Sequence, residues 1–322
     1  MRHLSAVTSR QVTARAPGKV NLLLNVGPVG PDGYHPLVSL FQAVGLTEDV
    51  TVSERAAGSG IRMSVSGDAT GAVPLDSRNI AWHAAEVLAQ HVGRVPDVAI
   101  HIDKGVPVAG GMAGGSADAA ATLVALDELW ETRVPRSELM LLAGDIGSDV
   151  PFCMMGGTAM GTGRGNLLTP AMARGTYQWA FASASKGLST PAVYRTFDII
   201  SAHPAGGPAL MPEPDPVLMA ALRAGDPAAL GGALRNDLQS AALHLRPELA
   251  RTMEVAREGG ALGVMVSGSG PTIAALASSE EHARMLATRW ESAGVAAGTW
   301  IAQGPVPGAR VLTPQVPAPL TA

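Results

Sequence analysis

The chain has 322 residues, 47% of them hydrophobic, and a formal net charge of −4. This length suffices for two ordinary domains or one large one, and the charge leaves no basic surplus for binding nucleic acid. The single cysteine, Cys153, excludes an internal disulfide, the first residues lack the apolar core of a signal peptide, and no apolar run reaches the ~18 residues of a membrane span. We therefore expect a cytoplasmic protein.

The N-terminal part of the chain predicts several strands and one helix. Residues 12–26 alternate between apolar and polar side chains, but Pro17-Gly18 interrupts them, so we expect a bulge or a tight bend. Lys19 follows that break directly. An amphipathic helix is expected at residues 79–91. Further short strands are expected at residues 38–44, 50–53 and 61–66.

A glycine-rich stretch, residues 106–118, separates an expected strand at residues 98–102 from a helix that is expected to begin at Ser116. Glycines let backbone N–H groups approach a ligand, and a helix N-terminus adds unpaired donors and partial positive charge, so the stretch predicts a phosphate site. It is not a Walker A loop, because no lysine precedes Ser116, and it is a poor dinucleotide fingerprint, because Ala109 replaces the first glycine. The alternative is a tight turn that only packs the helix on a sheet.

The rest of the chain predicts helices and strands in mixed order, which favours an α+β fold over a doubly wound sheet. Helices are expected at residues 136–143, 217–224, 228–233, 247–258 and 280–293. Strands are expected at residues 179–184, 264–266, 272–276 and 299–302. We expect an N-terminal domain over residues 1–165, a C-terminal domain over residues 166–303, and an unstructured, Pro-rich tail over residues 304–322.

Three motifs together resemble those of the GHMP small-molecule kinases. They are Pro-Gly-Lys-Val-Asn-Leu at residues 17–22, the glycine-rich loop at residues 107–118, and Ser-Gly-Ser-Gly-Pro-Thr at residues 267–272. The resemblance extends over residues 12–302. The loop departs from the common family pattern, because Ala109 and Ala113 stand where glycine is frequent.

Three further segments are similar to one branch of that family, the kinases that act on a cytidine diphosphate derivative of methylerythritol. These segments lie at residues 32–37, 147–152 and 236–238. The resemblance implies a two-domain α+β fold, with an N-terminal domain like ribosomal protein S5 domain 2 and a ferredoxin-like C-terminal domain. It also implies transfer of the ATP γ-phosphoryl group, with Mg²⁺, onto the 2-hydroxyl of a small cytidyl diphosphate substrate in non-mevalonate isoprenoid synthesis. No nucleic acid or membrane partner is implied, and we expect a monomer or weak homodimer.

Two other functions stay open. One is a GHMP kinase of the homoserine or mevalonate type, against which Gly33-Tyr34-His35 and Asn236-Asp237-Leu238 argue. The other is a GHMP-fold protein that senses a ligand without catalysis, against which the presence of both candidate catalytic residues argues.

Those catalytic residues are Lys19 and Asp149, which match the lysine and aspartate of the family. The resemblance implies that Asp149 is the base and that Lys19 keeps it charged and orients the acceptor hydroxyl. From the residues alone, Asp149 is better explained as the N-cap of a helix that begins at Val150-Pro151, and Lys19 as an ordinary solvated lysine. Asp145 is the nearby competitor for the role of base.

The resemblance also assigns the ATP site. Backbone N–H groups of the glycine-rich loop would hold the β- and γ-phosphates. Ser116 would bind phosphate or Mg²⁺, or simply cap its helix. Asn79 and Lys104 match positions near the adenine, with a solvated surface role as the alternative, and Asp118 stands where the family often has Asn. The expected nucleotide-binding residues are Pro107, Val108, Ala109, Gly110, Gly111, Met112, Ala113, Gly114, Gly115, Ser116, Ala117, Asn79, Lys104 and Asp118.

The acceptor site is assigned in the same way. Tyr34-His35 and Tyr194 match the positions that contact the cytosine, on which an aromatic face can stack. Asn21 lies two positions after Lys19, on the same face of the strand, and could bind the methylerythritol end. Thr190 and Asn236 are expected to line the same pocket.

Overall fold

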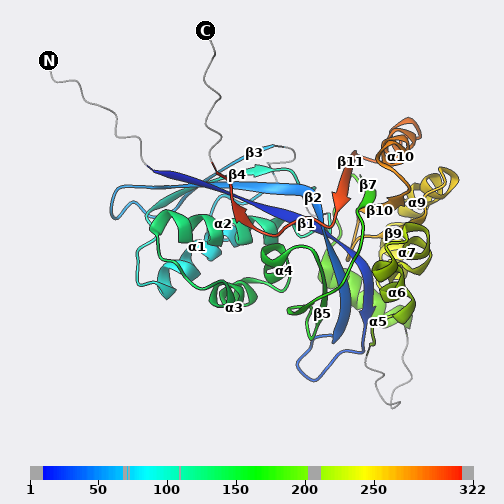
Figure 1. The fold of residues 1–322 in the computed structure, drawn as a ribbon, viewed down its shortest axis with the longest axis horizontal. Helices are drawn as coiled ribbons and strands as arrows, with labels where there is room; N and C mark the ends of the chain where they lie inside the picture. The colour runs from blue at the N-terminus through cyan, green and yellow to red at the C-terminus, as the bar shows by residue number, and fades with distance from the viewer. Residues whose placement is uncertain (1–9, 68–70, 72, 109, 202–211, 314–322) are drawn as a thin grey trace, which may run out of the picture.

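A computed structural model describes residues 10–67, 71, 73–108, 110–201 and 212–313, and its elements form two sheets with helices packed against them (Figure 1). The first sheet contains β1 (Gln11–Val26), β2 (Leu37–Glu54), β3 (Arg62–Gly67), β4 (Val98–Lys104), β5 (Thr158–Thr162), β6 (Leu167–Pro170), β8 (Arg235–Asn236) and β12 (Arg310–Val311). Its main order is β12-β1-β2-β4-β3, with β5 on β2, β6 on β5, and β8 parallel to β1. The second sheet contains β7 (Tyr177–Ser183), β9 (Gly263–Val266), β10 (Ile273–Ala277) and β11 (Gly298–Gly304), in the order β11-β7-β10-β9.

The helices fall into two groups. Those next to the first sheet are α1 (Ile80–His91), α2 (Gly114–Trp130), α3 (Arg136–Ile146) and α4 (Val150–Met155), and Figure 1 shows α1, α2 and α3 on one face of that sheet. The others are α5 (Thr190–Ser201), α6 (Pro216–Ala224), α7 (Pro227–Ala233), α8 (Gln239–Leu245), α9 (Leu249–Glu258) and α10 (Glu280–Ser292). Within the described residues, no helix combines the length and the apolar character that crossing a membrane requires.

The long pair β1 and β2 forms the centre of the first sheet. Their register shifts between Pro17 and Gly18, so the predicted bulge is confirmed. The two separate strands expected at residues 38–44 and 50–53 are wrong, because β2 runs unbroken through both and pairs with β1 and β4. Pairing with neighbours outweighs the broken local alternation.

Helix α2 is largely buried between the first sheet and its neighbouring helices. Twelve of its residues are buried, and its small alanines allow close packing between the sheet and α1, α3 and α4. The sequence predicts that this helix begins at Ser116, but it begins two residues earlier, at Gly114. Its N-cap residue, Ala113, has a φ of 61°, in the left-handed region that L-residues rarely adopt.

Three helices lie outside the main sequence-based prediction, although α4 corresponds to the alternative in which Asp149 is the N-cap of a helix that begins at Val150-Pro151. Both α4 and α5 carry a proline in their first turn, Pro151 and Pro191, where its missing N–H costs nothing. The third, α8, begins directly after Leu238. The tail prediction is wrong for residues 304–313, since β12 pairs with β1 and Ala309 is buried, with its N–H donated to the Cys153 carbonyl at 2.9 Å. Residues 314–322 lie outside the described residues. The first sheet also runs past the predicted division at residue 165, through β6, β8 and β12.

A buried charge cluster lies beneath the start of α2. Lys104 Nζ is 2.7 Å from Glu48 Oε1 and 2.7 Å from Asp118 Oδ2, and all three side chains are at most 4% exposed. The second oxygen of Glu48 accepts the N–H of Gly105 at 3.0 Å. Burial, reinforced by the Asp118 carboxylate and opposed by Lys104, raises the pKa of Glu48 to about 8. Burial also raises the pKa of Asp118 to about 6.

The cluster predicts that the protein loses stability as the pH rises. An unfolded glutamate has a pKa of about 4.3, so between roughly pH 5 and pH 8 the folded state binds more protons at Glu48 than the unfolded state does, and the free energy of unfolding falls with rising pH. Glu48→Gln keeps the shape without the charge and should flatten this part of the profile. Melting temperatures from pH 5 to pH 8.5 check this, and parallel profiles for the two proteins would contradict it.

Candidate active site

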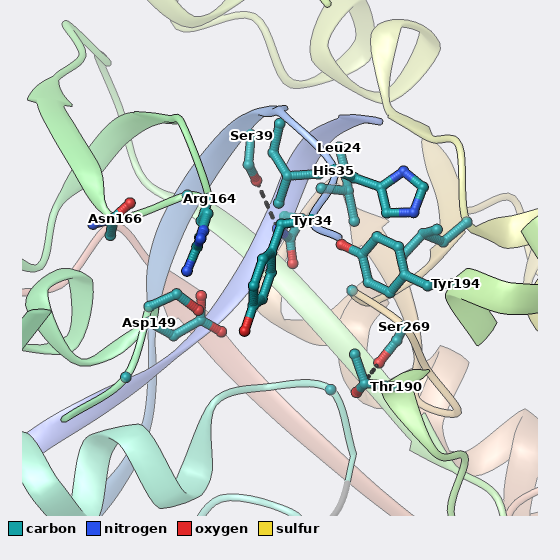
Figure 2. A pocket seen from close by; sticks show the side chains of 18 of the residues that line it. Leu24, Tyr34, His35, Ser39, Asp149, Arg164, Asn166, Thr190, Tyr194 and Ser269 are labelled. Atoms are coloured by element: carbon teal, nitrogen blue, oxygen red, sulfur yellow. Dashed lines mark hydrogen bonds between the residues drawn. The ribbon is translucent and has the colours of Figure 1, made fainter. Parts of the chain in front are cut away.

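A cavity of about 970 Å³ lies where the two halves of the chain meet. Its walls come from β1, from the loop between β1 and β2, from the start of α4, from the turn between β5 and β6, from α5, and from the loop between β9 and β10. Figure 2 shows the side chains that point into it. Residues from the N-terminal and C-terminal parts of the sequence therefore line one common cavity.

Lys19 and Asp149 meet in this cavity. Lys19 Nζ lies 3.8 Å from Asp149 Oδ2 and donates a 2.6 Å hydrogen bond to Asn21 Oδ1. The Asn21 amide donates to Ser39 Oγ at 2.7 Å, and Ser39 donates to the Leu23 carbonyl at 3.0 Å. Lys19, Asn21 and Ser39 are buried, so this chain of hydrogen bonds holds the ammonium group in one position. The alternative, a solvated Lys19, is therefore wrong.

Asp149 stands at the N-cap position of α4, but its side chain makes no capping hydrogen bond. The carboxylate is instead 30% exposed, close to Lys19, and it faces the cavity (Figure 2). It is therefore free to accept a proton from a bound ligand. Asp145 also lines the cavity, but Lys19 forms its ion pair with Asp149.

The glycine-rich loop packs against the loop between β9 and β10. A Cβ atom on Gly111, whose φ is 74°, would come within 2.4 Å of the Ser267 carbonyl oxygen, so only glycine fits there. Lys19 N–H donates to the Met112 carbonyl at 3.0 Å, which joins the loop to β1. Gly111 and Ala113 line the cavity.

The N-terminus of α2 offers unpaired donors beside this loop. The first helical hydrogen bond runs from Ala117 N–H to the Ala113 carbonyl, which leaves the N–H groups of Gly114, Gly115 and Ser116 without helical partners. Ser116 is not the N-cap, so its capping alternative is wrong. The described part of the loop can hold an anion.

Asn79, Lys104 and Asp118 lie away from the cavity surface. Asn79 Oδ1 accepts the N–H of Ala81 and so caps α1, while Lys104 and Asp118 belong to the buried cluster. A solvated surface role is wrong for Asn79 and Lys104, because both side chains are buried. Contact of these residues with adenine stays a prediction.

The predicted acceptor residues gather at the other end of the cavity. His35 Nδ1 donates to the Gly27 carbonyl at 2.7 Å, and the His35 and Tyr194 ring centres are 5.1 Å apart. Burial, with the Asp149 carboxylate adding to it, raises the pKa of Tyr194 to about 12, so the side chain stays a neutral phenol. Thr190 Oγ1 is 2.9 Å from Ser269 Oγ. These residues and Tyr34 line the cavity.

Asn236 does not line the pocket, contrary to prediction. Its amide nitrogen donates to the Val266 and Gly268 carbonyls at 2.8 and 2.7 Å, and its oxygen accepts Leu238 N–H at 2.9 Å. The residue therefore supports the loop between β9 and β10. Several polar lining residues were missed from the sequence, among them Ser39, Arg164, Asn166, Arg195, Asp198 and Ser269. Only Arg164 and Asn166 carry a local signal, which is the turn composition Thr-Gly-Arg-Gly-Asn of residues 162–166.

Comparison with known proteins adds independent findings. Residues 79–157 match the family GHMP kinases N terminal domain, and residues 218–296 match GHMP kinases C terminal. A 4-diphosphocytidyl-2-C-methyl-D-erythritol kinase of Mycolicibacterium smegmatis is 51% identical over 97% of this chain and 95% of the relative. A kinase of the same name from Thermobifida fusca is 52% identical over 96% of this chain and 100% of the relative. A crystal structure of a 4-(cytidine 5'-diphospho)-2C-methyl-D-erythritol kinase matches with a TM-score of 0.71 and 30% identity, over 91% of this chain and 99% of that one.

Proposed function

The chain belongs to the GHMP kinases and, within them, to the 4-diphosphocytidyl-2-C-methyl-D-erythritol kinases, and from this premise we propose that Asp149 and Lys19 carry its phosphoryl transfer. The protein is an ATP-dependent small-molecule kinase of the non-mevalonate route to isoprenoid precursors. The transferred group goes to the 2-hydroxyl of the acceptor. The observation that most supports these roles is the ion pair in the cavity. Buried Lys19 lies next to Asp149, whose carboxylate makes no capping hydrogen bond to α4.

Phosphoryl transfer needs aligned groups and neutralised charge more than covalent help from the protein. Asp149 accepts the proton of the acceptor hydroxyl as the hydroxyl oxygen bonds to the γ-phosphorus, and the bond from that phosphorus to the β-γ bridging oxygen breaks to leave ADP. Lys19, 3.8 Å from the Asp149 carboxylate, attracts the charge that develops on the acceptor oxygen. Asn21 and Ser39 fix the direction of Lys19.

The phosphates of ATP lie at the N-terminus of α2, where the free N–H groups of Gly114, Gly115 and Ser116 point. Mg²⁺ prefers oxygen donors and usually takes one or two from the protein beside phosphate oxygens and water. The Ser116 hydroxyl, partly exposed in the first turn of α2, fits such a donor set. When bound, the ion neutralises phosphate charge.

The cytidyl end of the acceptor lies among Tyr34, His35 and Tyr194. Tyr34 and Tyr194 both face the cavity (Figure 2), so that a planar base can stack on an aromatic ring. Thr190, held against Ser269, lies beside this space. These residues and Asp149 line a single cavity, so one ligand can contact both.

Tyr194→Ala is expected to weaken acceptor binding roughly 5- to 150-fold, because a stack of a base on an aromatic ring contributes about 1–3 kcal/mol. ATP affinity should stay within a factor of two, since Tyr194 lies at the acceptor end. Calorimetric titration of both ligands checks this. Equal loss for ATP, or an unchanged affinity for the acceptor, would remove Tyr194 from the cytidyl site.

The function is tested by measuring ADP release with each of four candidate acceptors. The protein is supplied with 4-diphosphocytidyl-2-C-methyl-D-erythritol, homoserine, mevalonate or galactose, and we expect turnover with the first alone. Turnover of homoserine or mevalonate would favour another GHMP kinase, and binding without ADP release would favour a sensor. We also propose that the protein acts in the cytoplasm as a monomer or weak homodimer, for which size-exclusion chromatography is the test.

A further inference from the structure

Arg164 makes a close stack that the reaction as described does not use. It lies in the turn between β5 and β6, and its guanidinium carbon is 3.6 Å from the centre of the Tyr34 ring. Attraction between an arginine and an aromatic face extends to about 6 Å, so this contact lies well within that range. Arg164 and Tyr34 both line the cavity, and both are about half exposed.

Asp32 joins the two partners of this stack. Its Oδ2 accepts a 3.0 Å hydrogen bond from Arg164, and its Oδ1 accepts the backbone N–H of Tyr34 at 3.1 Å. The Tyr34 N–H first, and Arg164 second, lower the pKa of Asp32, so the carboxylate stays charged at neutral pH. A backbone hydrogen bond of 2.8 Å from Leu37 N–H to the Gly163 carbonyl ties the two loops together. Asp32, Arg164 and Tyr34 thus form a closed triangle.

The triangle leaves one face of Tyr34 open. Figure 2 shows Tyr34 between Arg164 and Tyr194, with Arg164 over one face of the ring. A planar ligand that stacks on Tyr34 therefore takes the opposite face, in the space bounded by Tyr194. Because Arg164 already fixes the Tyr34 ring, the ring loses less conformational freedom when a ligand binds. Arg164 can therefore increase ligand affinity without contacting the ligand itself.

We propose that Arg164 is a positioning residue for the acceptor, which together with Asp32 fixes the Tyr34 ring as one wall of the slot for the cytosine base. This inference rests on the proposed function of the cavity and adds to it a determinant of acceptor affinity. The planar guanidinium matters, because a lysine has the charge but cannot stack in the same way. The competing role for Arg164 is direct binding of the acceptor's diphosphate.

The two roles are separated by calorimetric titration of cytidine, which has no phosphate, and of cytidine diphosphate. For Arg164→Ala we expect both affinities to fall by the same factor, roughly 3- to 10-fold, while ATP binding is unchanged. Arg164→Lys and Asp32→Asn should show most of that loss. In steady-state kinetics the KM for the acceptor should rise with little change in kcat.

Two comparisons make the result specific. Arg94→Ala removes a similar stack outside the cavity, since Arg94 lies 5.4 Å from the Trp130 ring centre and 3.7 Å from Glu54, and it should leave cytidine affinity unchanged. In a Tyr34→Ala background, Arg164→Ala should add no further loss, because it acts through that ring.

Loss confined to cytidine diphosphate would assign Arg164 to the phosphates and overturn the proposal. An unchanged cytidine affinity in Arg164→Ala, with wild-type turnover intact, would overturn the proposal and leave the proposed function standing. A wild-type protein that neither binds cytidine nor phosphorylates the acceptor would contradict both.

Discussion

Asp149→Asn is expected to lower kcat by at least ~10²-fold, and by up to ~10⁴-fold, which is the usual contribution of a positioned proton acceptor. The substitution keeps the size of the side chain and, because Asp149 makes no capping hydrogen bond, it should leave α4 and the melting temperature nearly unchanged. Lys19→Ala should cause a comparable loss of turnover, since it removes the charge 3.8 Å from the carboxylate. Stopped-flow or coupled measurement of ADP release checks both variants.

The matched control is Asp145→Asn. Asp145 lines the same cavity but does not form the ion pair with Lys19, so its loss should be far smaller. If the folded Asp149→Asn protein turns over like the wild type, or if Asp145→Asn has the larger effect, the assignment of the base is wrong.

Gly115→Val is expected to abolish measurable ATP binding while acceptor binding survives. Gly115 is exposed in the first turn of α2, and a Cβ atom there would meet only Ile80 Cγ2, at 3.4 Å. The valine therefore fits the fold, but its methyl groups occupy the space in which phosphate oxygens approach the free N–H groups. Paired titration of an ATP analogue and of the acceptor, with a melting curve, checks this.

The control for this experiment is Gly232→Val, a change at another exposed helical glycine, in α7, where an added Cβ meets no atom within 4 Å. It carries the same helix-propensity cost without touching the loop and should bind ATP normally. Retained ATP affinity in Gly115→Val would rule out the phosphate site. Parallel loss of both ligands with a large drop in melting temperature would favour a loop that only packs the helix.

Local pattern predicted most of the elements. Three features appear as expected: the Pro17-Gly18 bulge, the helix after Asn79, and the pair of strands around residues 267–272. Each is signalled by residues that are neighbours in the sequence. Where long-range pairing decides, prediction failed. Strand β2 continues through residues 45–49 because β1 and β4 pair along it, and β12 orders part of an apparently featureless tail.

The candidate site divides in the same way. The roles of Lys19 and Asp149 come from the family resemblance, and nothing in either local sequence indicates that they approach within 3.8 Å. Lys104 was predicted to lie near the adenine or at the surface, and its burial was missed, because no pattern in one strand reveals two carboxylates brought to it by β2 and α2. Arg164 gave only a turn signal, since its stack on Tyr34 depends on how two distant loops meet.

The central claim is that ATP phosphorylates the 2-hydroxyl of 4-diphosphocytidyl-2-C-methyl-D-erythritol in the Lys19–Asp149 cavity, and ³¹P NMR of the complete reaction tests it most directly. We predict one new phosphomonoester resonance coupled to the methylerythritol carbon skeleton at position 2, an unchanged acceptor diphosphate, and one ADP for each acceptor consumed. Release of inorganic phosphate with the acceptor intact, or a phosphate on any other hydroxyl, would contradict the account.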